Sequence, residues 1–436
     1  MRSWYTRVSL GLAILLGVAT ILTTLAACGS PSQSSGPVQL TFWSFNQQIT
    51  EQAAIFNRTH PNIHVTALKE PSGPNQYYPK VISSVNAGNA PDVALIEYQY
   101  IPTMVSNGAL VDISQYGANS VKSQFASSAW SQVTRGSAVY GIPQDTGPMG
   151  LFYRKDIFQR AGISSPPATW AEFAQDAVKI HSLGPNYYIT AFPPSSTGWL
   201  QSLMWQAGAT WFSIDTAHNA WKVSINSAAS KQVAAYWQDL LNRGLVSTVA
   251  DFSNDWGAAL DKGTIASWPS AVWGQGVVTS DAQDTSGKWA VSPMPQWTAG
   301  ANVSGMWGGS AISVISGTKH PKEAAEFAEW YLTNTQSLTI GVKEIGWFPA
   351  NLAARSFPEV TSPNPFFSNQ VIDTIFANAN VPATWTWPPD LTTVNKDMGD
   401  DVNSAVANKT PLSGALDQLQ QQVIQDLHNN NINVES

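Results

Sequence analysis

The first 28 residues constrain the chain most, because they end at the only cysteine of the sequence. Arg2 and Arg7 stand at the start of an apolar stretch over 8–22, in which Ser9 and Thr20 are the polar exceptions. A basic start, an apolar run and small residues before a cleavage point are typical of a secretory signal. With one cysteine there can be no internal disulfide, so an exported chain of this kind must be stable through its core.

Leu25-Ala26-Ala27-Cys28 resembles the bacterial lipobox, in which the cysteine is acylated and becomes the mature N-terminus. We therefore predict a lipoprotein signal peptide at 1–27, lipidation at Cys28, and a flexible Ser/Gly/Pro/Gln tether over 28–37. The expected location is outside the cytoplasm, anchored to the cell membrane by lipid. The alternative is a membrane-spanning helix that ends in an unmodified cysteine, but the apolar stretch is shorter than the roughly 20 residues that a span needs.

Charge and length narrow the function classes. Removal of 1–27 takes away two arginines and no acidic residue, so the formal charge changes from 22 − 29 = −7 to 20 − 29 = −9. A protein with this net negative charge is not expected to bind the negatively charged backbone of nucleic acid. Because charged residues are only 12% and tryptophans number 19, the chain is too apolar to be disordered. A length of 436 residues exceeds one ordinary core and favours two domains.

Strands alternate with helices in the first part of the chain. We predict strands at 38–43, 63–68 and 91–96, with helices at 47–57 and 77–87 between them. This order predicts right-handed crossovers and a mostly parallel sheet, and hence an α/β fold.

The rest of the chain continues in mixed α/β style. Gln144–Pro148 is a Gly/Pro-containing connection between two short strands and is suited to a hinge. Thr169 and Glu172 fit a capping box that opens a helix. Further elements follow from hydrophobic spacing: helices at 102–107, 198–207, 228–243, 253–262, 321–332 and 412–427, and strands at 139–143, 150–153, 265–268, 289–291 and 311–315.

Sequence motifs for phosphate binding, for a serine nucleophile and for a zinc protease are missing. His60 and His64 are four residues apart, but Pro61 separates them in an extended segment, so we predict no metal site and no cofactor. Glu97 and Asp145 each follow a predicted strand. They could serve as ligand-binding carboxylates, or as the acid and base of a glycoside-cleaving enzyme.

Five groups of motifs carry a family resemblance. The most specific is Tyr140-Gly141-Ile142-Pro143 with Asp145, followed by Leu151–Asp156 and Pro167–Trp170. The others are Phe42-Trp43-Ser44 with Phe56-Asn57, Ala90–Val93 with Gly108–Asp112, Gly263–Ala266 with Trp273, and Trp307–Ile312 with Pro321–Leu332 and Gly346–Ala350. In this order, behind a lipobox, they resemble the bacterial extracellular solute-binding proteins of sugar ATP-binding-cassette importers, the maltose-binding-protein-like group.

The resemblance implies a type II periplasmic-binding-protein-like fold, with two hinged α/β lobes and the ligand in the cleft between them. One lobe would hold 38–145 and 312–349, and the other 146–311 and 350–436. The implied partners are a small sugar and the permease subunits of the importer. We expect a monomer, no enzymatic activity and no nucleic-acid partner.

Tryptophan placement points to a sugar. Flat indoles cover the apolar faces of a sugar ring, and carboxylates and amides bind its hydroxyls. Six tryptophans lie at predicted strand ends or beside Gly and Pro: Trp43, Trp268, Trp273, Trp307, Trp347 and Trp385. Each could instead be a packing residue, which is how we interpret the helical Trp170, Trp205, Trp237 and Trp330. The resemblance favours Trp273, Trp307 and Trp385, because the family's counterparts of these segments line the cleft.

Five polar residues complete the predicted ligand site: Asn46, Gln47, Glu97, Gln99 and Asp145. The plain alternative for each is an exposed loop residue or a helix cap. These loops contain no cluster of Lys and Arg, which argues for a neutral ligand. The leading hypothesis is thus a lipid-anchored receptor for an oligosaccharide or glycoside. The alternatives are a cell-surface enzyme acting on polysaccharide, and the same fold with a polyamine or a glycerol phosphodiester as ligand.

Overall fold

The computed structural model describes residues 36–46, 48–71, 76–215, 217–218 and 220–435. The signal peptide, the lipidation at Cys28 and nearly all of the tether were predicted for residues that lie outside this part, as does Gln47. The chain divides into units 1–36 and 37–436, and everything below concerns the second unit. Within the described residues, every helix is too short or too polar to span a bilayer.

A five-stranded sheet holds the first strands of the chain, in the order β2-β1-β3-β12-β6. Its strands are β1 (Val38–Ser44), β2 (Ile63–Lys69), β3 (Val93–Glu97), β6 (Ile142–Pro143) and β12 (Ser310–Val314). β1 runs parallel to β2 and β3, whereas β12 runs antiparallel to β3 and β6. Parallel pairing is therefore confirmed for the first three strands, and the return strand β12 makes the sheet mixed.

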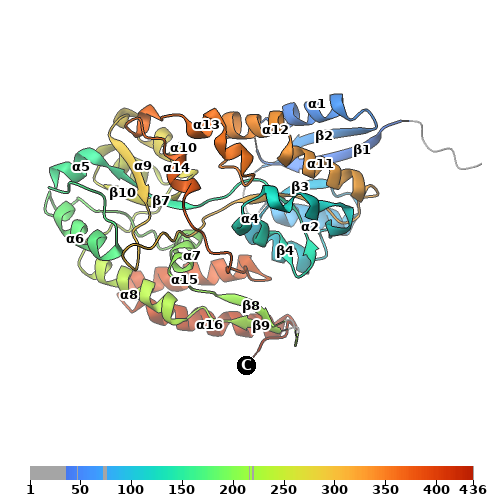
Figure 1. Cartoon of the computed structure of the whole chain (residues 1–436). Helices are drawn as coiled ribbons and strands as arrows, with labels where there is room; N and C mark the ends of the chain where they lie inside the picture. The colour runs from blue at the N-terminus through green and yellow to red at the C-terminus, as the bar shows by residue number, and fades with distance from the viewer. Residues whose placement is uncertain (1–35, 47, 72–75, 216, 219, 436) are drawn as a thin grey trace, which may run out of the picture. The chain divides into compact units, whose positions relative to one another are not determined.

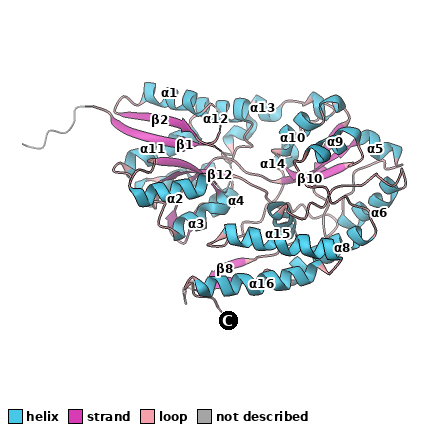
Figure 2. Ribbon diagram, turned by 180° about the vertical axis from the view of Figure 1, so that it is seen from behind, coloured by secondary structure: helices cyan, strands magenta, loops and turns pink. Residues whose placement is uncertain are grey.

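Helices cover this sheet and bury its apolar residues (Figures 1 and 2). They are α1 (Ile49–Thr59), α2 (Tyr77–Ala87), α3 (Ile101–Ser106), α4 (Ser127–Gln132), α11 (Pro321–Thr333) and α12 (Thr335–Ile340). The fully buried Phe42 of β1 lies with its ring centroid 5.4 Å from those of Phe327 and Tyr331 of α11. Residues almost 300 positions apart thus share one core, which fixes α11 on the first sheet.

A second, three-stranded antiparallel sheet has the order β10-β7-β11. Its strands are β7 (Met149–Arg154), β10 (Ser267–Ala271) and β11 (Trp289–Pro293). Around it lie α5 (Lys155–Arg160), α6 (Trp170–His181), α7 (Thr197–Gln206), α8 (Ala228–Asn242), α9 (Asn254–Lys262), α10 (Gly274–Asp281), α13 (Pro358–Thr361) and α14 (Asp373–Ala377). The capping box is confirmed, because Thr169 Oγ1 accepts from the Glu172 N–H at 3.1 Å and Glu172 Oε2 accepts from the Thr169 N–H at 3.3 Å.

Two long helices end the chain, α15 (Leu391–Asn408) and α16 (Leu412–Asn429), and they lie side by side in Figure 2. Two small hairpins complete the described strands, β4 (Thr134–Arg135) with β5 (Ala138–Val139), and β8 (Phe212–Asp215) with β9 (Ala220–Val223). The predicted strand at 139–143 is therefore split between β5 and β6, and the strand predicted at 265–268 is displaced to β10.

The connections between the two sheets pair with one another. The Thr146 N–H donates to the Phe348 carbonyl at 2.9 Å, and the Ala350 N–H donates to the Gln144 carbonyl at 3.1 Å. The Trp307 N–H donates to the Gly147 carbonyl at 2.8 Å. The predicted hinge connection thus belongs to a hydrogen-bonded group of three crossing segments, which we call the hinge ladder: 144–148, 306–310 and 348–350.

Candidate functional site

Asp145 lies at the hinge ladder, where it is tied to the first residue of β12. Its Oδ1 accepts from the Ser310 N–H at 2.8 Å and from the Ser310 hydroxyl at 2.6 Å. The Tyr98 hydroxyl donates to the Asp145 carbonyl at 2.8 Å. Burial raises the pKa of Asp145, and the bonds from Ser310 oppose that shift. A half-buried carboxyl with one oxygen already bonded can offer its other oxygen to a ligand.

Glu97 ends β3 directly opposite Ser310 in the sheet register. Its Oε2 accepts from the Tyr78 hydroxyl at 2.7 Å, and the Tyr78 ring stacks on Tyr100 at 3.8 Å. Burial raises the pKa of Glu97; the hydrogen bond from Tyr78 opposes this shift, and the nearby charge of Asp145 adds to it. The two acids predicted from sequence are therefore electrostatic neighbours.

Amide groups extend this polar cluster toward the end of β1. Asn46 Nδ2 donates to Gln144 Oε1 at 3.5 Å, and Gln144 Nε2 donates to the Ser310 hydroxyl at 3.1 Å. Gln99 is half-buried two residues beyond Glu97, to which its side chain also hydrogen bonds. The structure thus brings together four of the five polar residues that we predicted, and the fifth, Gln47, lies outside the described residues. Gln144 and Ser310 were missed.

Two of the predicted tryptophans meet at the other end of the hinge ladder. The ring centroids of Trp273 and Trp307 lie 4.7 Å apart, and Trp273 Nε1 donates to the Trp307 carbonyl at 2.8 Å. Both rings are half-buried, whereas Trp268 lies beneath them with 2% of its surface exposed. Gly308 and Gly309, at φ 84° and 106°, turn the chain from Trp307 to Ser310. Trp307 is therefore three residues along the chain from Ser310, at the centre of the polar cluster.

Phe252 completes this group and was missed from the sequence. Its ring is 53% exposed and lies 6.2 Å from each of Trp273 and Trp307. Its φ of 59° is left-handed, a strained conformation for a bulky residue that often marks a functional position. We call Phe252, Trp273 and Trp307 the aromatic corner. A possible sequence signal was an aromatic residue just before Ser253, which caps α9 through a bond from the Trp256 N–H.

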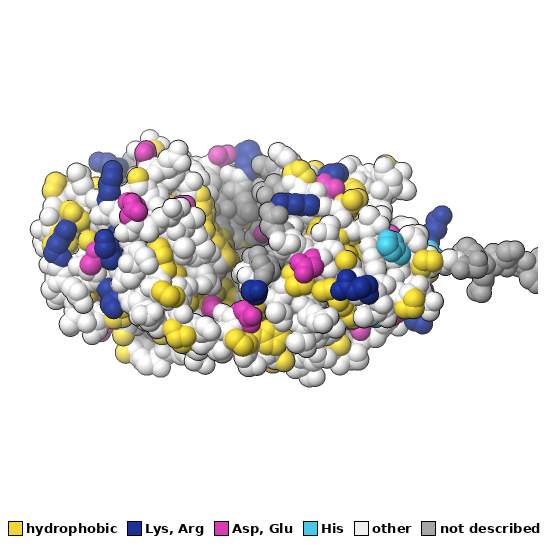
Figure 3. Space-filling view, turned by 90° about the horizontal axis from the view of Figure 1, so that it is seen from above, with side chains coloured by type: hydrophobic (Ala, Val, Ile, Leu, Met, Phe, Trp, Pro, Cys, Tyr) yellow, Lys and Arg dark blue, Asp and Glu magenta, His cyan; other side chains and the backbone are white. Residues whose placement is uncertain are grey.

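Asp251 adds a further carboxyl beside the aromatic corner. Its Oδ2 accepts from the Ser196 hydroxyl at 2.6 Å, and burial raises its pKa. The segment before α7 also approaches closely, since a Cβ on Gly198 would lie 2.8 Å from Trp307 Nε1. Viewed from above, the surface is hollowed between the elements of the two sheets (Figure 3).

The remaining predicted tryptophans lie elsewhere. Trp43 is half-buried with the Lys80 ammonium 4.4 Å from its ring centroid. Trp347 is 6% exposed and packs on Tyr331. Trp385 is 4% exposed and belongs to the tryptophan cluster described next. The structure does not test whether any of them contacts a ligand, so these assignments stay predictions.

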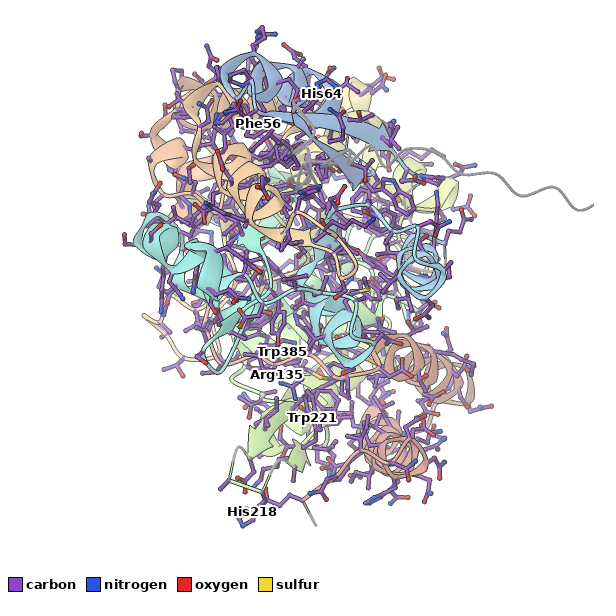
Figure 4. The ribbon with its side chains drawn as sticks, turned by 90° about the vertical axis from the view of Figure 1, so that its right-hand side faces the viewer. Phe56, His64, Arg135, His218, Trp221 and Trp385 are labelled. Carbon is purple, nitrogen blue, oxygen red and sulfur yellow. The ribbon has the colours of Figure 1, made fainter. Side chains whose placement is uncertain are left out.

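A second tryptophan group, which we call the sealed cluster, consists of Trp205, Trp211, Trp385 and Trp387. Trp385 stacks on Trp205 with an interplanar angle of 12° and a centroid distance of 5.4 Å. Trp385 also borders a cavity of about 420 Å³ next to Trp221 and Arg135. Figure 4 labels these three residues on neighbouring elements, with Phe56 and His64 far from them.

The tryptophans that we assigned to the core from their helical positions are confirmed in three cases. Trp170, Trp205 and Trp237 are at most 2% exposed. Trp330 is half-buried and packs on Phe56. Within the described residues, His, Cys, Asp and Glu form no group of three or more that could hold a metal ion.

Comparison with known families assigns the class. Residues 43–337 match the model of the bacterial extracellular solute-binding protein family. The chain belongs to this family, and the two-lobed α/β fold expected from the sequence is confirmed.

Relatives within the family bind sugars. The lactose-binding protein of Rhizobium radiobacter is 27% identical over 84% of this chain and 87% of its own length. The arabinooligosaccharide-binding protein of Bacillus subtilis (strain 168) is 23% identical over 72% of this chain and 73% of its own.

Solved structures agree with these relatives. The galacto-N-biose/lacto-N-biose I-binding protein of the ABC transporter from Bifidobacterium longum, in complex with lacto-N-biose, has a TM-score of 0.79 and 28% identity, and the match covers 92% of this chain and 99% of that one. The ABC-transporter binding protein of B. animalis subsp. lactis Bl-04, in complex with beta-1,6-galactobiose, has a TM-score of 0.76 and 26% identity over 92% and 100%.

Proposed function

We propose that this protein is the substrate-binding component of an ABC importer and captures a neutral oligosaccharide or glycoside. The observation that carries the proposal is the aromatic corner, because Trp307 stands three residues along the chain from Ser310. Around Ser310 lie Asn46, Glu97, Gln99, Gln144 and Asp145, which we call the carboxyl–amide cluster. The hydrogen-bond partners of Glu97, Asp145 and Gln144 in the described part of the chain are hydroxyl, amide and backbone groups. Such surroundings suit a ligand that carries hydroxyls and no charge.

The chemistry of a sugar ring suggests separate roles for the aromatic and the polar residues of the site. Its C–H faces would stack on Trp273, Trp307 and Phe252, because aromatic rings give large apolar contact at low entropic cost. Its hydroxyls would donate to the remaining oxygens of Glu97 and Asp145 and bond to the amide of Asn46. We keep Gln47, Gln99, Trp43, Trp268, Trp347 and Trp385 as further candidate contacts.

Closure around the ligand would use the hinge ladder. We propose lobes of 38–145 with 312–349 and of 146–311 with 350–436, since the three-stranded sheet falls in the second pair of ranges and the five-stranded sheet in the first, apart from Ser310 and Ala311 at the start of β12. Hinge closure of two domains around a ligand is a well-established motion, and here it would bring the carboxyl–amide cluster toward the aromatic corner.

Attachment and delivery complete the proposal. Removal of 1–27 and acylation of Cys28 would anchor the protein outside the cytoplasm, with 28–37 as its tether. The monomer would pass its sugar to the permease subunits of the importer without breaking any bond, so that Glu97 and Asp145 act as ligands rather than as a catalytic pair.

Calorimetric titration of the mature domain tests this function. The panel should contain lactose, lacto-N-biose, beta-1,6-galactobiose and arabino-oligosaccharides, with spermidine, glycerophosphocholine and amino acids as the non-sugar arms. We expect saturable heat from at least one neutral sugar and its loss in Trp307→Ala, with Trp330→Phe as the matched control. Heat from the non-sugar arms alone would overturn the proposal, and shortening of a labelled oligosaccharide would favour the enzyme.

A further inference from the structure

A polar cavity of about 290 Å³ lies beside the hinge ladder, apart from the aromatic corner. Its lining comes from four stretches: the start of α4 with Ser127 and Ser128, the hinge residues Thr146 and Pro148, Leu352 with Arg355, and residues 376–381. α4 contacts β6 of the five-stranded sheet, whereas α14 contacts β7 and β11 of the three-stranded sheet. The cavity is therefore built by elements that belong to both sheets.

The cavity lies on the other face of the hinge from Asp145. Asp145 pairs with Pro349 in an antiparallel bridge, and the next residue donates its N–H to the Phe348 carbonyl at 2.9 Å. Successive side chains of such an extended segment point to opposite faces. Since Asp145 points to Ser310, Thr146 points away from the carboxyl–amide cluster, and it is Thr146 that lines the cavity.

Arg355 brings a positive charge to this cavity. Its Nε donates to the Pro349 carbonyl at 3.1 Å, and its guanidinium carbon lies 5.0 Å from the Phe348 ring centroid. Among the residues that the structure describes, no carboxylate forms an ion pair with Arg355. Burial lowers its pKa, although the Tyr98 hydroxyl partly opposes this. A desolvated guanidinium without a counter-ion is unfavourable, which makes an anionic ligand favourable at this position.

Thr146 provides an independent sign of a missing partner. It is 5% exposed, and its Oγ1 has no hydrogen-bond partner among the described residues. Buried hydroxyls in native proteins are almost always paired. The hydroxyl oxygen itself has almost no accessible surface, but Thr146 lines the cavity, so rotation about its Cα–Cβ bond would turn the hydroxyl toward a ligand bound there. Together, a guanidinium fork and a hydroxyl donor match the geometry of a small oxyanion.

We propose that this hinge cavity is a binding site for a small inorganic oxyanion such as sulfate or phosphate, held by Arg355 and Thr146. The site does not depend on the nature of the sugar, and it would exist even if the proposed sugar site failed. Because its walls belong to both sheets, the bound oxyanion would connect them on the face of the hinge opposite Asp145.

Calorimetric titration of the mature domain with sodium sulfate and with sodium phosphate, at ionic strength held constant with sodium chloride, tests this site. We expect saturable binding of at least one of the two, weakened at least about 100-fold in Arg355→Gln and about tenfold in Thr146→Val, since bonds to charged groups are the stronger ones. Arg355→Lys should bind with intermediate affinity, because it keeps the charge but loses the fork.

Arg243→Gln is the matched control, because it removes an exposed arginine that pairs with Asp239 at 2.8 Å. It should bind the oxyanion as the wild type does. Absence of saturable binding, or equal binding by Arg355→Gln and the wild type, would overturn the proposal. Should Arg355→Gln fail to fold, Thr146→Val decides, since a hydroxyl-to-methyl change of the same shape that leaves the affinity unchanged equally contradicts it.

Discussion

The aromatic corner and the sealed cluster are both rich in tryptophan, yet they differ in what their rings contact. In the corner, Trp273 and Trp307 are half-buried and Phe252 is 53% exposed. In the sealed cluster, Trp385 and Trp387 are 4% and 5% exposed. A ring that is almost fully buried stabilises the fold, whereas a more exposed ring can bind a ligand. The number of tryptophans alone does not separate these two roles.

The hydrogen bonds around the tryptophans also differ between the sealed cluster and the aromatic corner. In the sealed cluster, Trp387 Nε1 donates to Gln132 Oε1 at 2.8 Å, and Gln132 Nε2 donates to the Trp385 carbonyl at 3.2 Å. Gln132 is the last residue of α4, so this buried amide fastens the 385–387 segment to the first sheet's helices. In the corner, Trp273 Nε1 donates to the Trp307 carbonyl, which belongs to the hinge ladder. One group is therefore tied to a packed helix and the other to the segment expected to move.

The largest expected effect separates the two groups directly. Trp307→Ala should reduce sugar affinity by about 30-fold or more, because a stacked aromatic anchor at a binding site contributes roughly 2–4 kcal/mol. Its free energy of unfolding should fall less than that of Trp385→Ala, which we expect to lose about 3–5 kcal/mol as a core truncation.

Paired titration and urea unfolding of these two variants provide the measurement. If Trp385→Ala lost sugar affinity at unchanged stability, this would support the ligand contact that we predicted for Trp385 from the sequence. Equal loss of stability in both variants would remove the distinction between the two groups.

Gln132→Ala tests what holds the sealed cluster. It removes both bonds to the 385–387 segment and leaves buried polar groups without partners, which costs about 1–3 kcal/mol each. We expect a lower urea midpoint with sugar affinity within about twofold of the wild type. Gln232→Ala, at an exposed position of α8, is the control; a fall in its midpoint as large as that of Gln132→Ala would contradict the assigned role.

Phe252 allows a sharper test of the corner. Phe252→Gly should stabilise the fold by about 1 kcal/mol, because glycine adopts a positive φ without strain. It should also weaken sugar binding by about tenfold through loss of the exposed ring. Leu68→Gly, at another exposed apolar side chain but within β2, should instead lose stability without losing affinity. An unchanged affinity in Phe252→Gly would exclude Phe252 from the site.

The smallest expected effect concerns pH and the carboxyl beside the corner. Burial raises the folded-state pKa of Asp251 above its unfolded value. The folded protein then binds more protons than the unfolded chain between those two values, so this group's contribution lowers stability as pH rises from about 4 toward the raised pKa. In Asp251→Asn the unfolding free energy, relative to that of the wild type, should increase as pH rises through that window. A relative decrease would mean that the sign is wrong.

Much of the fold could be predicted from the sequence because local signals agree with it. The alternation of strands and helices up to β3 and the Thr169 capping box depend on neighbouring residues only. The β12 return strand could not be predicted in its antiparallel direction, since it pairs with strands more than 160 residues away in sequence.

The site was predictable in part for the same reason. Trp273 and Trp307 stand beside Gly residues, and this indicates loops. Phe252 is not flanked by glycine. A single residue in the left-handed conformation also produces no periodic hydrophobic pattern in the sequence. The burial of Trp385 depends on Trp205 and Trp211, far away in the chain, so its environment could not be predicted from its own neighbours.

The pairing of the three crossing segments also restricts how the protein can move. Segments bonded edge to edge bend as one ribbon, so the bodies on either side can open and shut much more easily than they can twist or slide. One introduced pair of spectroscopic probes across the gap would then follow the whole motion. Because the natural cysteine lies at position 28, thiol labels can be placed on a mature domain that begins after it without interference from any native thiol.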